Sequence, residues 1–133
     1  MITIIKAKEL EDDTDFEPPL VLGRGITEST VKNTRLTLSH NFIPPGGRNQ
    51  RHYHVKTDAG MFILRGRLRL FFGPDFNMKE AIAEEGDFVF IPQGEIHGLM
   101  NLSDTEPAQI GACFGGVGSE DEAETIFVEP PWV

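Results

Sequence analysis

An all-β fold, either a sandwich or a barrel, is predicted for this 133-residue chain by three features of its sequence. Short runs alternate between apolar and polar residues with the period of two that is typical of strands. The 14 glycines and 9 prolines stand mostly between those runs, where tight turns are needed. Some runs, such as residues 88–91, are apolar on both faces and must be covered on two sides. The length predicts a single domain over residues 1–133.

The first third of the chain contains one weak and one strong strand signal. Residues 1–8 alternate weakly and are predicted as an edge strand, whereas residues 11–19 are acidic, end in two prolines and predict a loop. Residues 34–43 alternate strictly and predict a strand that ends at the Pro-Pro-Gly-Gly run of residues 44–47.

The remaining strand signals are apolar or β-branched runs bounded by Gly, Pro or Asn. They lie at residues 52–54, 60–64, 67–73, 86–92, 96–100 and 107–114. Residues 74–85 lack a strand pattern and admit a short helical turn at residues 78–84. The glycine-rich, acidic residues 115–122 predict a solvated loop.

Charge and cysteine content exclude several classes of function. The net charge of −9 opposes binding to nucleic acid or to an anionic membrane surface, because both need a basic footprint. No apolar run reaches the length of a membrane span. The single cysteine, Cys113, excludes an intrachain disulfide and favours a small buried hydrophobe over a nucleophile. A cytoplasmic protein is therefore predicted.

Three of the four histidines stand where a metal site is expected. His52 and His54 are two residues apart on a predicted strand, so both side chains project from one face. Their Cα atoms are expected about 6–7 Å apart, a separation that two imidazoles can close onto one metal ion. His97 follows a Pro-x-Gly turn and would join them if its strand lies beside theirs.

The segments around these histidines, residues 46–66 and 86–101, resemble the two sequence motifs of the cupin family. The first motif is a Gly, five residues, His-x-His and a closing Gly, which correspond to Gly46, His52, His54 and Gly66. The second is matched at all its fixed positions, namely Gly86, Pro92, Gly94, His97 and Asn101. The resemblance covers about residues 34–114.

This resemblance implies a cupin double-stranded β-helix, a jelly-roll-like, closed or nearly closed antiparallel barrel. It also implies one divalent metal ion per chain, bound by His52, His54 and His97. The family's glutamate ligand falls on Ala59, and the neighbouring Asp58 is out of phase and points to the other face. The resemblance therefore narrows to cupins that bind metal through three histidines, some of which are iron dioxygenases. Fe(II) is favoured, and Zn, Mn or Ni would also suit this donor set.

Three neutral imidazoles leave the full charge on the metal, which favours a small anionic substrate that chelates it. The first functional hypothesis is an Fe(II) dioxygenase-type oxidoreductase acting on such a molecule. The alternatives are a metal-dependent isomerase or lyase and a non-catalytic small-molecule-binding cupin, because one fold carries many activities.

Further residues are predicted around the metal. Gln50 is in phase with the histidines and is interpreted as a supporting group, an extra ligand or a solvent-facing loop residue. Met61 and Ile63 follow Ala59 in phase and are expected to line an apolar pocket. Asn101 is expected to hydrogen-bond a turn.

Other side chains are assigned to the surface or to the core. His40 shares a face with Leu36 and Leu38 and is interpreted as a core or rim histidine rather than a ligand. Arg65, Arg67 and Arg69 alternate and predict a solvated strand face.

A homodimer is predicted from the strand at residues 60–64. Phe62 and Leu64 lie opposite Met61 and Ile63, so the outer face of this strand is apolar as well and needs a cover. A two-fold dimer is the commonest solution, and the N-terminal residues 2–5 are expected to add to the partner's sheet, as in the cupins that the chain resembles.

Overall fold

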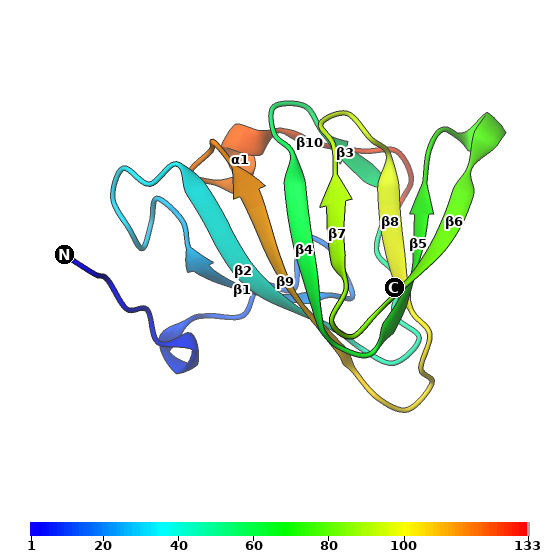
Figure 1. Cartoon of the computed structure of the whole chain (residues 1–133), viewed down its shortest axis with the longest axis horizontal. Helices are drawn as coiled ribbons and strands as arrows, with labels where there is room; N and C mark the ends of the chain where they lie inside the picture. Colours follow the sequence, from blue (N-terminus) through cyan, green and yellow to red (C-terminus); the bar gives the residue numbers. More distant parts are fainter. Residues whose placement is uncertain (133) are drawn as a thin grey trace.

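A computed structural model describes residues 1–132, which form two five-stranded antiparallel sheets that face each other (Figure 1). The strand order of sheet I is β1 (Val21–Ile26), β2 (Leu36–Ile43), β9 (Ala108–Gly115), β4 (Ala59–Arg65), β7 (Phe88–Ile91). The order of sheet II is β10 (Thr125–Phe127), β3 (His52–His54), β8 (His97–Asn101), β5 (Arg67–Phe72), β6 (Lys79–Glu84). Helical structure is limited to η1 (Ala7–Glu9), η2 (Asp75–Asn77) and α1 (Glu120–Ala123) within the described residues.

The prediction of an all-β, jelly-roll-like fold is confirmed, and of the two expected forms, closed or nearly closed, the barrel is not closed. No strand pairing within residues 1–132 joins sheet I to sheet II, so the architecture is a jelly-roll-like β-sandwich. The chain changes sheet at turns instead of continuing one ladder around a barrel. Gly66 lies in such a turn, between β4 and β5, with a φ of 94° that favours glycine. A Cβ atom there would stand 2.9 Å from the Cβ of Ala108.

Seven strands coincide with predicted runs, and the differences are confined to weak signals. Residues 1–8 contain no strand, and the short η1 begins at Ala7. The helical turn admitted at residues 78–84 is wrong, because β6 pairs with β5 along its whole length and this pairing overrides its charged sequence. The loop predicted at residues 115–122 ends in α1. β1 and β10 were not predicted; β10 has only three residues, too few to show a period.

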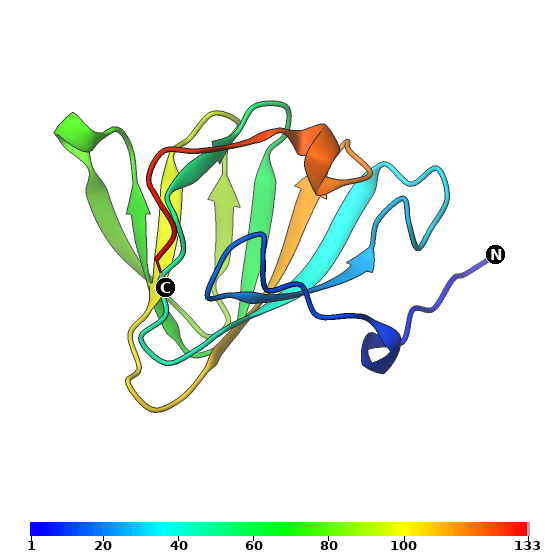
Figure 2. The same ribbon diagram turned by 180° about the vertical axis from the view of Figure 1, so that it is seen from behind.

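The hydrophobic core lies between the sheets and leaves one end of the sandwich for a cavity. Its members are the buried side chains Leu20, Leu22, Ile43, Ile63, Leu68, Ala83, Leu99, Ala108 and Ile110. The view from behind shows the C-terminal segment running along β3, while the first residues extend away from both sheets (Figure 2). No helix among the described residues is long and apolar enough to cross a membrane.

Candidate metal centre

The three histidines of the two motifs meet on adjacent strands of sheet II. β3 carries His52 and His54, and β8 carries His97, which pairs directly with His52 in the antiparallel register. One nitrogen from each ring lies within 4.8 Å of the others. His52 and His54 are buried and His97 is half-buried. His52 and His54 therefore share a face because of their spacing on one strand. His97 lies beside them because β8 pairs with β3.

Hydrogen bonds leave the outer ring nitrogens free to bind a metal. The Nδ1 atoms of His52 and His97 donate to the carbonyl oxygens of Gln50 and Glu95, at 2.8 and 2.9 Å. The Nδ1 atom of His54 lies 3.0 Å from the Thr125 hydroxyl, which can accept its proton. With Nδ1 protonated, each Nε2 keeps its lone pair, which is the tautomer that metal-binding histidines adopt. The donor set therefore fits a divalent transition metal.

The surroundings also hold the imidazoles in the neutral form that binds metal. Burial lowers the pKa of His54 to about 3, helped by the nearby charges of His52 and His97. Burial likewise lowers the pKa of His97 to about 4 and depresses that of His52. All three rings are therefore uncharged at neutral pH and need not lose a proton to bind a cation.

A cavity of about 310 Å³ opens beside the histidines, between the two sheets. The facing wall is polar where β2 turns Thr37, Ser39 and Asn41 inward. The Ser39 hydroxyl donates to the Asn41 side-chain oxygen over 3.3 Å, and the Thr37 hydroxyl accepts from the Phe114 amide over 3.0 Å. The remaining lining is mainly apolar, so the cavity suits a small molecule with an apolar body and a few polar atoms.

The three predicted pocket residues on β4 do not all reach the cavity. Ala59 and Met61 line the cavity beside the histidines. Ile63 faces the same side but is completely buried in the hydrophobic core, so the prediction that it lines the pocket is wrong. Alternation along a strand gives the face of a side chain but not its depth between two sheets, and Ile63 lies one step too far along.

Gln50 and Asn101 are both buried and serve as supports. The Gln50 side chain donates to the Glu129 carbonyl oxygen over 2.5 Å, while its own backbone carbonyl accepts from His52. Gln50 is therefore not solvent-facing, and it supports the segment that carries His52. The Asn101 amide nitrogen donates to the carbonyl oxygens of Ile43, Pro44 and Glu106, at 3.1, 3.2 and 2.8 Å. These contacts are the turn-stabilising bonds expected of it.

A carboxylate that sequence reasoning missed lies next to the histidines. Glu17 comes from the acidic N-terminal loop, and its Oε1 atom is 3.5 Å from the Nε2 atom of His52. Its Oε2 atom accepts from the Asn49 side chain over 3.1 Å. Burial raises the pKa of Glu17, partly offset by the Asn49 hydrogen bond and by the charges of His97 and Arg24. No motif spacing marks this residue, and the sequence predicted only an acidic loop at this place.

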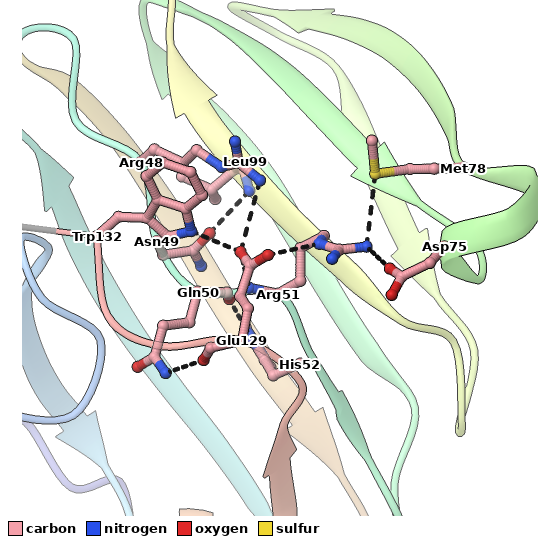
Figure 3. A network of polar contacts seen from close by, with 10 residues as sticks. All are labelled: Arg48, Asn49, Gln50, Arg51, His52, Asp75, Met78, Leu99, Glu129 and Trp132. Atoms are coloured by element: carbon pink, nitrogen blue, oxygen red, sulfur yellow. Dashed lines mark hydrogen bonds and ion pairs between the residues drawn. The ribbon is translucent and has the colours of Figure 1, made fainter.

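The C-terminal segment anchors the strand that carries His52 and His54, as Figure 3 shows. The Glu129 carboxylate accepts from the Arg51 backbone amide and guanidinium, both at 2.8 Å, and from the Trp132 indole at 2.6 Å. Arg48 stacks on the Trp132 ring, with its guanidinium carbon 4.0 Å from the ring centroid. Burial alone would raise the pKa of Glu129, but these donors outweigh it and hold the pKa below its usual value.

His40 and the three arginines singled out in the sequence are not among the residues that line the cavity, whereas Cys113 is. His40 projects from the outer face of β2 and packs edge-on against Phe42, with ring centroids 5.1 Å apart. Arg65, Arg67 and Arg69 pair with glutamates at the surface, as predicted for a solvated face. The prediction that Cys113 is buried is wrong, since it is exposed on β9 between glycine-rich neighbours.

Solved structures with the same fold are found at low sequence identity. The polyketide cyclase RemF from Streptomyces resistomycificus is 16% identical, with a TM-score of 0.77 over 98% of this chain and 87% of that one. An oxalate decarboxylase from Bacillus subtilis is 15% identical, with a TM-score of 0.77 over 96% of this chain and 33% of that one. An oxalate oxidase is 16% identical, with a TM-score of 0.71 over 96% of this chain and 67% of that one.

Sequence comparison finds curated relatives and a family. Germin-like protein 5-1 of Oryza sativa subsp. japonica is 29% identical over 117 residues, which cover 86% of this chain and 53% of the relative. Germin-like protein subfamily 2 member 1 of Arabidopsis thaliana is 29% identical over 116 residues, covering 84% and 52%. The chain thus spans about half the length of these relatives. The profile of the cupin domain matches residues 41–113, more than half of the chain. With both motifs folded around the histidine cluster, the chain belongs to the cupin family.

Proposed function

We propose that the chain binds one divalent metal ion through His52, His54 and His97 and acts on a small organic anion in the adjoining cavity. The observation that carries this proposal is the convergence of three nitrogens within 4.8 Å while each Nδ1 atom is held by a hydrogen bond. Such an arrangement is typical of a preorganised metal site. A bound metal would supply Lewis-acid or redox chemistry to a coordinated substrate.

The chain's own residues would orient the substrate and keep water out. Met61 and its apolar neighbours exclude bulk water, which strengthens electrostatic attraction inside the cavity. The side-chain oxygen of Asn41 accepts from the Ser39 hydroxyl, and the Asn41 amide nitrogen has no hydrogen-bond acceptor among the described residues. This amide is therefore placed to donate to a substrate oxygen from the wall that faces the histidines. Two of the similar structures are an oxalate oxidase and an oxalate decarboxylase, and oxalate is a small organic anion of the proposed kind.

As the finer function, we propose an Fe(II)-dependent oxidation that uses dioxygen as the oxidant. Three imidazoles leave several coordination positions of a six-coordinate metal for a chelating anion and a small gas molecule. The cavity of about 310 Å³ limits the substrate to a small organic acid or diketone. A substrate that enters already ionised needs no separate base.

A metal-dependent isomerase or lyase is the second candidate, because the same donor set suits zinc. One of the similar structures is a polyketide cyclase, an enzyme named for a reaction other than oxidation.

Reconstitution of the apo-protein separates these functions. Apo-protein loaded with Fe(II), Mn(II) or Zn(II) is offered oxalate, diketones, catecholic acids and 2-hydroxybenzoates, while dissolved oxygen and product formation are followed. Oxygen uptake with Fe(II) that is absent in His97→Ala supports the oxidoreductase. Turnover without oxygen supports the isomerase or lyase. Ligand binding without turnover under any metal would contradict both and leave a binding protein.

A further inference from the structure

The carboxylate of Glu17 is the one acidic group among the described residues that lies within ion-pair distance of a histidine of the cluster, namely His52, and it belongs to neither cupin motif. Two observations need an explanation. The side chain is buried, with 9% of the residue exposed, although a carboxylate is costly to bury without a cation. Within residues 1–132, no lysine or arginine lies within ion-pair distance of it; its ion-pair contact is with His52.

The loop around Glu17 is held firmly enough to fix this position. Leu20, which is completely buried, donates its amide to the Glu17 carbonyl oxygen over 2.8 Å. The Asn49 amide nitrogen contacts Oε2 of Glu17, while the Asn49 oxygen accepts from the Leu99 amide over 2.8 Å. Asn49 thus links Glu17 to β8, the strand that carries His97. One carboxylate oxygen is engaged and the other is turned toward His52.

The contact between Glu17 and His52 is between two acceptors. His52 carries its proton on Nδ1, which donates to the Gln50 carbonyl oxygen, so Nε2 presents a lone pair to the carboxylate. Two lone pairs facing each other repel unless a cation lies between them. Ligand atoms that are each about 2.1 Å from one metal ion are about 3.0 Å apart at right angles and about 3.4 Å apart in a tetrahedron. The observed separation is 3.5 Å.

We propose that Glu17 is a direct metal ligand, so that the N-terminal loop supplies the carboxylate that Ala59 does not. The inference rests on the proposed metal site and refines it. The protein donor set becomes three imidazoles and one carboxylate, and a divalent ion in the site keeps one net positive charge. A six-coordinate ion then keeps two open positions, so that an anion bound through one atom and dioxygen can occupy the metal together, whereas a chelating anion fills both positions. A single acidic substituent of the substrate would neutralise that charge, which narrows the preferred substrates to monoanions at the metal.

Metal affinity of the full-length chain tests this proposal without reference to activity. Apo wild type, Glu17→Gln and the control Asp15→Asn are titrated with Zn²⁺ against a competing chelator. Asp15 lies in the same loop and is exposed. The substitution Asp15→Asn removes one negative charge, as Glu17→Gln does. Loss of a direct ligand should weaken Zn²⁺ binding by about 100-fold, at or beyond the upper end of what loss of a supporting residue costs. Asp15→Asn should bind as wild type does.

The Co²⁺ absorption spectrum gives an independent readout of the ligand set. The visible bands of the Co²⁺-loaded protein should shift in Glu17→Gln and stay unchanged in Asp15→Asn, because only the former alters the coordination. Apo Glu17→Gln should melt at or above the wild-type temperature, since it removes a buried unpaired charge. If its melting is not cooperative, Glu17→Ala takes its place in both measurements.

Equal Zn²⁺ affinity and an unchanged Co²⁺ spectrum in a folded Glu17 variant would overturn the proposal. His52→Ala distinguishes this failure from a failure of the metal site itself. If wild type binds metal and His52→Ala does not, the site stands and only the role of Glu17 falls. If wild type and His52→Ala both fail to bind, the proposed function falls, and this inference with it.

Discussion

The outer faces of the two sheets differ in chemistry. On sheet II, β5 and β6 expose cross-strand ion pairs, with Arg67 3.5 Å from Glu84 and Arg69 3.7 Å from Glu80. On sheet I, the corresponding surface is apolar. Its exposed large side chains are Leu36, Leu38, Phe42, Leu64, Phe88 and Phe90. Sheet II exposes Ile82 on β6 and Ile126 on β10 as well, so the two faces differ in degree, and the larger apolar patch lies on sheet I.

Strand β2 shows what this difference teaches. Its polar residues Thr37, Ser39 and Asn41 face the cavity, while Leu36 and Leu38 face outward. An ordinary half-buried strand has the reverse pattern. This inversion is what the proposed ligand and the proposed homodimer would require of sheet I, namely a polar wall inside and an apolar exterior outside. Sheet II instead holds the histidines inside and meets solvent outside.

The largest effect on metal binding is expected when a histidine of sheet II is replaced, and a histidine of sheet I serves as the control. His97→Ala should weaken Zn²⁺ binding by more than about 100-fold, because it removes a direct donor. His40→Ala, on the outer face of sheet I, should leave metal binding unchanged. Elemental analysis and chelator competition measure both. Full metal content in His97→Ala would show that the cluster of sheet II is not the metal site.

The apolar exterior of sheet I predicts a homodimer, which we propose as the solution state. Phe88 and Phe90 are 83% and 69% exposed and would be central in such an interface. Replacing both by Lys should dissociate the dimer, since buried aromatic anchors contribute about 2 kcal/mol or more each. Light scattering at micromolar concentration measures the mass. Arg67→Ala on sheet II is the control and should remain dimeric; a monomeric wild type would contradict the proposal.

The pH dependence of apo-protein stability tests the interior of sheet II. Burial places the pKa of His54 at about 3 and that of His97 at about 4, below the ordinary 6.5. The unfolded chain therefore takes up protons before the folded chain does, so stability is complete above pH 6.5 and is lost as pH falls toward 4. Thermal melts of the apo-protein across this range measure the loss. His54→Asn should show a shallower decline, and an identical one would contradict the assignment.

The smallest expected effects are on the free energy of unfolding, when one of two glutamates is replaced. Glu129 lies in the C-terminal segment beside β3, and Glu84 lies on the exterior of sheet II. Glu129→Gln should lower the free energy of unfolding by about 1–2 kcal/mol, because it weakens charge-assisted hydrogen bonds of the half-buried Arg51. Glu84→Gln should cost less than about 0.5 kcal/mol, since its ion pair with Arg67 is exposed. Urea unfolding measures both. Equal costs would show that the Glu129 contacts do not brace β3.

Periodicity and motif spacing determined most of the strands and part of the site from the sequence alone. A strand has a period of two in any context, so the common face of His52 and His54 follows from their spacing. The glycines of both motifs mark turns for a similarly local reason. Gly94, with a φ of 84°, allows the turn before His97, and its amide donates to the His54 carbonyl oxygen over 2.9 Å.

Only the tertiary structure decided the depth of a side chain and the identity of its distant neighbours. Ile63 has the same phase as Met61 but lies in the core, because the sheets close over it. Glu17, Thr125 and Glu129 reach the histidine strand from opposite ends of the chain, through contacts that no local pattern encodes. Sequence pattern reports which face a residue occupies because backbone geometry is local. Which groups share that face depends on the packing of the whole chain.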